Sequence, residues 1–129
     1  MSSDTTADWN GSTVETPLFV DAPEILLSVQ ELLGKKWHPV IVYELLENGP
    51  MGFSALKKSV EGISSKMLSE SLDNLEAAEV VERNVESERP VRVTYSLTDR
   101  GHELEPVIRG MVEWGSENVD RATVTAGER

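Results

Sequence analysis

The side chains that most often do chemistry are scarce in this sequence. It contains no cysteine and only two histidines, His38 and His102, which are isolated from each other. No Ser-His-Asp spacing, P-loop or dinucleotide-binding glycine pattern is present. Thiol redox chemistry and cysteine metal sites are therefore excluded, and two histidines are too few to indicate a metal site. We expect no catalytic residue, no metal ion and no cofactor.

A polar run that begins at Ser64 has a different chemistry, that of hydrogen bonding to nucleic acid. Leu68, Leu72 and Leu75 recur at the spacing of one helical face, and Ser64 can cap that helix. The opposite face would carry Lys66, Ser69, Glu70 and Asp73, with Ser65 near the first turn. Such side chains can bond base edges or phosphate, and free amides at a helix start favour phosphate. The pattern predicts a recognition helix, although the solvated face of an ordinary core helix would look the same.

A second short helix precedes this one, and a glycine-containing turn joins the two. Ser54 is expected to cap it, and Leu56 and Val60 to be buried. Two short helices joined in this way are typical of a helix-turn-helix. Lys57 and Lys58 on the first of them are placed to touch a DNA backbone; the alternative is a solvated lysine pair.

Two strand-like runs follow, over residues 80–85 and 91–97. The link 86–90 is polar and ends in proline, as the tip of a β-hairpin would. A helix-turn-helix followed directly by a hairpin predicts a winged helix.

The predicted wing carries two arginines. Arg89 would lie at its tip, from which arginine can enter a narrow minor groove, and Arg92 would point out of the second strand. The alternative is a cross-strand salt bridge to Glu86 or Glu88.

Further helices are expected on both sides of this unit. Pro23 suits the start of a first helix, which ends at Gly34. Trp37 opens a second helix, which an Asn-Gly-Pro run terminates. Thr98 can cap a long last helix, which Pro106 should kink or split. The apolar side of this last helix would bury Leu104, Val107, Ile108, Met111 and Trp114.

The apolar stripe of the first helix is larger than one short partner helix could cover, so part of it is expected in a dimer interface. Tryptophans are too large and apolar to be casual surface residues and are interpreted as core or interface anchors. The predicted interface residues are Ile25, Leu26, Val29, Trp37, Met111 and Trp114.

The charge is unusual for a protein that would bind DNA. Acidic residues outnumber basic ones by 23 to 12, which gives a net charge of -11. One interpretation is that the protein does not touch nucleic acid. The other is that it works in very high salt, where acidic surfaces keep proteins soluble and the Debye length falls to about 3 Å at 1 M. The composition resembles that of proteins from salt-in halophiles.

The order of these pieces resembles the HxlR-type winged helix-turn-helix regulators of bacteria and archaea. Five motifs in register carry the resemblance, over about residues 23–119: Leu33-Gly34-Lys35-Lys36-Trp37, Gly49-Pro50-Met51-Gly52-Phe53-Ser54-Ala55-Leu56, Gly62-Ile63-Ser64-Ser65-Lys66-Met67-Leu68-Ser69, Pro90 to Gly101, and Leu104-Glu105-Pro106-Val107 with Trp114-Gly115.

The resemblance implies a homodimer whose two recognition helices read a pseudo-palindrome and regulate nearby genes. This sequence departs from the family in three respects. Gly52 replaces an arginine, Glu70 and Ser71 stand where the family often has Gln and Arg, and the N-terminal cysteine through which some members sense oxidants or aldehydes is absent.

The sequence thus predicts a mainly α, dimeric winged helix-turn-helix with a small β-hairpin wing. Residues 22–121 would form the domain, between a flexible arm at 1–21 and a flexible tail at 122–129. The expected function is sequence-specific binding of double-stranded DNA as a cytoplasmic transcriptional regulator, with no membrane span and with a small-molecule inducer as a further option. The alternative is a winged-helix module that binds proteins and not DNA.

Overall fold

The computed structural model describes residues 21–119. The predicted tail at 122–129 and all but the last residue of the predicted arm at 1–21 lie outside this range. The chain divides into two units, 1–35 and 36–129, and each is described by itself.

The first unit contributes one described helix, α1 (Ala22–Leu33). Pro23 lies in its first turn, where a missing N–H costs nothing, and the N–H of Gly34 closes the helix on the carbonyl of Gln30. Its side chains are apolar around most of the helix. Large apolar groups are exposed at Ile25, Leu26, Leu27 and Val29.

The second unit contains the helices α2 (His38–Asn48), α3 (Phe53–Ser59), α4 (Ser65–Ala77), α5 (Asp99–His102) and α6 (Glu105–Asn118) and the strands β2 (Val81–Glu88) and β3 (Val91–Leu97). α2 contacts α3, α6 and β3, while α4 contacts β2. The core between these elements is aliphatic: Ile41, Val42, Leu45, Leu56, Val60, Ile63, Leu68, Leu72, Leu75, Val80, Val81, Leu97 and Ile108.

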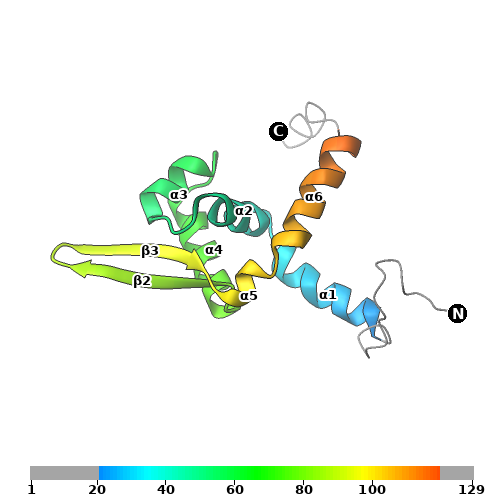
Figure 1. Cartoon of the computed structure of the whole chain (residues 1–129), viewed down its shortest axis with the longest axis horizontal. Coiled ribbons are helices and arrows are strands. Elements are labelled where there is room, and N and C mark those ends of the chain that lie inside the picture. Colours follow the sequence, from blue (N-terminus) through cyan, green and yellow to red (C-terminus); the bar gives the residue numbers. More distant parts are fainter. Residues whose placement is uncertain (1–20, 120–129) are drawn as a thin grey trace, which may run out of the picture. The chain divides into compact units, whose positions relative to one another are not determined.

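The two strands form one antiparallel hairpin, as the sequence predicts (Figure 1). The pairing begins at Val81↔Leu97 and ends at Glu88↔Val91, and it is interrupted by a bulge between Val85 and Ser87. β2 therefore runs three residues beyond its predicted end at residue 85, because the polar link pairs with β3. The hairpin is held to the helices at Met51, which exchanges two backbone hydrogen bonds with Tyr95.

The predicted cap of α3 is wrong. Ser54 is the second residue of the helix, and the capping position is occupied by Gly52, which provides no side chain. The predicted cap of α4 is confirmed: the Ser64 hydroxyl accepts a hydrogen bond from the backbone N–H of Met67 at 3.0 Å.

The last predicted helix is in fact two. Thr98 caps the single turn α5, where its hydroxyl accepts from the N–H of Gly101 at 2.9 Å. Pro106 lies in the first turn of α6, and so it starts a new helix where the sequence allowed a kink or a split. Of the residues expected to be buried here, only Ile108 is; Val107, Met111 and Trp114 are exposed, and Leu104 is intermediate.

Candidate nucleic-acid interface

The α4 helix presents a polar surface because its apolar side is completely used by the core. Leu68, Leu72 and Leu75 are at most 1% exposed. The residues predicted to read DNA all lie on the exposed part of the helix or at its cap: Ser64, Ser65, Lys66, Ser69 and Glu70. The structure thus brings the predicted set together on one short, capped helix.

The N-terminus of α4 is suited to an anion. Ser64 satisfies only the Met67 amide, so other amides of the first turn have no partner within the helix. These amides and the helix dipole together favour a negative group such as phosphate.

Ser71 differs from the other polar residues of α4, since it is 3% exposed and belongs to the core. The serine that stands where the family often has arginine therefore adds no polar group to the exposed face. Glu70, in contrast, is exposed and places a negative charge where a polyanion would approach.

Two lysines precede α4 in the last turn of α3. Lys57 and Lys58 are both exposed. Gly62, in the turn to α4, has a φ of +92°, a conformation that side chains with a Cβ rarely adopt. Gly62 thus allows the tight turn that joins the end of α3, which carries both lysines, to the start of α4.

The wing arginines are both exposed. Arg89 lies in the link between the two strands, and Arg92 lies in β3, where it pairs with Ser87 of β2. The alternative of a cross-strand salt bridge is not found. Glu86 accepts a hydrogen bond from the Thr94 hydroxyl at 2.9 Å, and within residues 21–119 every ion pair involves Arg109. Both guanidinium groups are therefore available for a phosphate or a groove.

The predicted dimer residues have a different environment. Ile25, Leu26 and Val29 on α1 and Met111 and Trp114 on α6 are all exposed apolar residues. Trp37 is the exception. It is half-buried at the start of α2, and its ring contacts the side chain of Lys36 within the chain.

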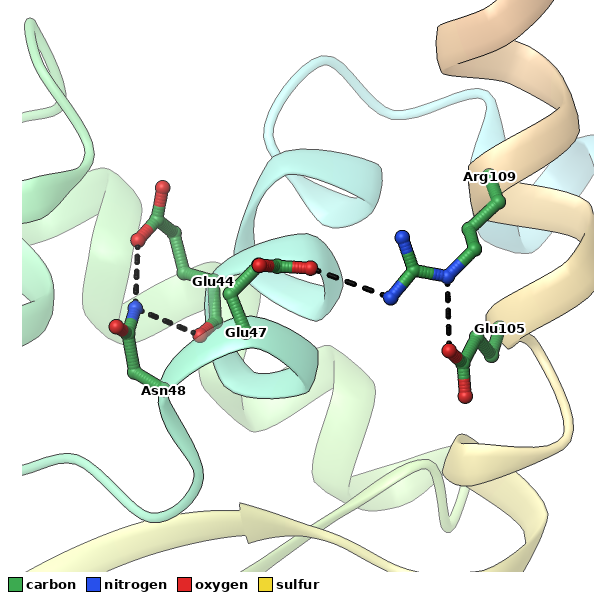
Figure 2. A network of polar contacts seen from close by, with 5 residues as sticks. All are labelled: Glu44, Glu47, Asn48, Glu105 and Arg109. Carbon is green, nitrogen blue, oxygen red and sulfur yellow. Dashed lines mark hydrogen bonds and ion pairs between the residues drawn. The ribbon is translucent and has the colours of Figure 1, made fainter.

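A polar network between α2 and α6 was not predicted from the sequence (Figure 2). Arg109 donates from Nε to Glu105 at 2.8 Å and from Nη2 to Glu47 at 3.3 Å. The Glu105 hydrogen bond is the main cause of a raised pKa for Arg109. The i,i+4 spacing of Glu105 and Arg109 could have indicated the first pair, but no local signal points to Glu47.

An apolar groove of about 260 Å³ lies between the same two helices. It is lined by Pro39, Val40, Tyr43, Ile108, Met111 and Val112. The groove continues the exposed apolar surface of α6 toward α2.

Within residues 21–119 no cluster of three or more His, Asp or Glu side chains could hold a metal ion. In the same range no helix combines the length and the apolar character needed to cross a bilayer.

The helix pair α3–α4 and the hairpin that follows it define a winged helix-turn-helix protein. Residues 32–123 match the HxlR-like helix-turn-helix family. The chain belongs to this family, and it is a DNA-binding transcriptional regulator of the HxlR type.

Relatives and solved structures agree with this assignment. The chain is 41% identical over 90 residues to the HTH-type transcriptional regulators YvaP and YodB of Bacillus subtilis, which covers 70% of this chain and 82% and 80% of theirs. The reduced form of YodB superposes with a TM-score of 0.66 at 38% identity, over 75% of this chain and 94% of that one. The redox regulator HypR in its reduced form gives a TM-score of 0.70 at 32% identity, over 78% and 98%.

Proposed function

We propose that this regulator binds a pseudo-palindromic operator as a homodimer and inserts α4 of each protomer into the major groove. The residues proposed to contact base edges are Ser65, Lys66, Ser69 and Glu70. The groups proposed to contact phosphates are Lys57, Lys58, Arg89, Arg92 and the backbone amides that follow Ser64.

The exposed surface of α4 supports this proposal. It is mostly polar, it begins at a capped N-terminus, and the basic residues beside it make no ion pairs within residues 21–119. A recognition helix requires such a surface to approach base edges.

Dimerisation is supported by the exposed apolar residues of α1 and α6. Two α4 helices related by a twofold axis would read half-sites about one helical turn apart, roughly 34 Å. The folded domain is proposed to span residues 22–121, and the protein to act in the cytoplasm without enzymatic activity. The sequence contains no cysteine, so the signal we propose is a small-molecule inducer and not thiol oxidation.

Fluorescence anisotropy tests the proposal, with labelled DNA from upstream of the protein's own gene and with KCl from 0.1 M to several molar. We expect sequence-selective binding that survives at high salt, where screening weakens the repulsion between the acidic protein and DNA. In the matched variant Lys66→Ala, operator affinity should fall by about tenfold or more, since good contacts to guanine are worth ~1–3 kcal/mol. A Lys66→Ala protein that binds as tightly as the wild type would remove Lys66 from the reading surface.

A second function is favoured by the acids on α4. Glu70 and Asp73 are exposed there and would repel phosphate but attract a basic protein segment. Absence of selective DNA binding at every salt concentration would support this winged-helix protein-interaction module in place of the regulator.

A further inference from the structure

Lys36 is a cation outside the set of residues predicted to contact DNA. It is exposed, and its Nζ lies 4.9 Å from the centroid of the Trp37 ring. A cation over an indole face is attracted by the ring quadrupole. The contact therefore restricts the position of a side chain that is otherwise flexible.

The ring that holds Lys36 lies against the turn that leads into α4. Trp37 is the capping residue of α2, and a Cβ placed on Gly62 would be 3.8 Å from its Cη2 atom. Gly62 stands two residues before Ser64, the cap of α4. The Trp37 ring thus links the Lys36 ammonium to the turn before α4, although Lys36 lies far from that helix in the sequence.

The kind of contact matters as much as its position. Arg109, the other cation with described side-chain partners, is paired with two carboxylates and so has lost much of its attraction for an anion. An indole ring orients a lysine without neutralising it, and Lys36 makes no ion pair within residues 21–119. Its full charge remains available to a ligand.

We propose that Lys36 is a further phosphate-contacting residue, positioned by Trp37 at the turn before α4, and that it binds the DNA backbone beside each half-site. This inference rests on the proposed function, since it assumes that α4 enters the major groove. Contacts to phosphate set register and affinity but carry no sequence information. Lys36 should therefore strengthen binding to every duplex by a similar factor.

The test compares Lys36→Gln with Arg100→Gln, which removes the same charge elsewhere. Arg100 lines a hollow with Glu76 and Glu79 near the other end of α4. That end is roughly 18 Å along the helix from its start. Affinity for operator and for a scrambled duplex is measured by anisotropy from 0.1 to 0.5 M KCl, with Lys36→Arg as the variant that keeps the charge.

Each phosphate contact contributes about -0.9 to the slope of log K against log salt. In a dimer, Lys36→Gln should make this slope shallower by about 1.8 and should weaken both duplexes tenfold or more at 0.1 M. Lys36→Arg should keep the wild-type slope, and Arg100→Gln should leave it unchanged.

If the slope of log K against log salt for Lys36→Gln equals that of the wild type, Lys36 does not contact phosphate. The proposed DNA-binding function would remain. If the wild type itself binds no duplex at any KCl concentration from 0.1 M to several molar, the proposed function fails and the role of Lys36 fails with it. Trp37→Phe separates charge from positioning: it keeps a ring, and we expect a several-fold loss of affinity with the slope retained, after circular dichroism has shown an intact fold.

Discussion

The helices α4 and α6 have nearly the same length, 13 and 14 residues, but they differ in what they leave uncovered. α4 buries its leucines completely and exposes polar side chains. α6 buries only Ile108 and leaves Val107, Met111 and Trp114 exposed, with Trp114 at 64%.

This difference separates two kinds of surface. The apolar side of α4 is covered by its own chain, so its polar side is free to meet a ligand. The apolar side of α6 is incomplete within one chain, and contiguous exposed apolar surface of this kind marks an interaction site. We thus propose that α4 contacts the bases of DNA. We propose that α6 holds two copies of the chain together, so that their α4 helices lie about one turn of DNA apart.

Truncation of Leu72 should have the largest effect on stability. Leu72 is 1% exposed, and Leu→Ala at such a site costs about 2–5 kcal/mol through lost burial and a residual cavity. Urea unfolding at fixed protein concentration measures the change. Met67→Ala on the same helix, where Met67 is 38% exposed, is the control and should cost less than about 1 kcal/mol. Equal losses for the two would contradict the assignment of the buried side of α4.

Trp114→Asp tests the exposed side of α6. A central tryptophan in an interface contributes about 2 kcal/mol or more, so the dimer should dissociate at least ~30-fold more readily. Sedimentation velocity at micromolar concentration should show a monomer. Val85→Asp introduces the same acid on the wing, at a residue that is 52% exposed, and should remain dimeric. A dimeric Trp114→Asp protein would exclude α6 from the interface.

Ser64 caps α4 and lies at the proposed phosphate site, so it is expected to affect both stability and DNA binding. Two variants separate these two roles. Ser64→Ala removes the acceptor for the Met67 amide and should cost about 1 kcal/mol. Ser64→Asp restores a good cap and should regain this stability, but its carboxylate occupies the place proposed for a phosphate. We expect DNA affinity to fall roughly tenfold for Ser64→Asp, as expected for the loss of one charge-assisted contact. Wild-type affinity in Ser64→Asp would place the phosphate elsewhere.

Arg109→Gln should have the smallest effect. Its partners Glu47 and Glu105 are exposed, so the ion pairs are weakened by solvent and by salt. A melting temperature slightly below that of the wild type is expected in 10 mM salt, with no difference in 1 M KCl. A difference that persists at 1 M KCl would show that Arg109 contributes by packing and not by charge.

Much of the fold could be predicted because its signals are local. Leucines at helical spacing and a serine before them predicted α4 and its cap, and alternating residues predicted the hairpin. The cap of α3 could not be found in this way, since Gly52 caps with extended backbone and no side chain. The end of β2 was missed because its last residues, 86–88, are polar and do not alternate with apolar side chains as a typical strand does.

The parts that sequence could not predict depend on contacts between distant segments. Arg109 meets Glu47 across 62 residues, and Trp37 meets the turn at Gly62. The burial of α6 was overestimated for a related reason: an apolar stripe does not tell whether its own chain or a second copy covers it. The residues assigned to DNA contact and the halophilic origin both stay predictions.

Selection of binding sites from a random duplex library most directly tests whether α4 of a dimer reads DNA. The library is incubated with the wild-type protein at several KCl concentrations, and the bound fraction is sequenced. We predict an enriched pseudo-palindrome whose half-sites are centred about one helical turn, ~10 bp, apart, and the loss of its half-site preference in Lys66→Ala. Enrichment of no sequence at any salt concentration would contradict the account.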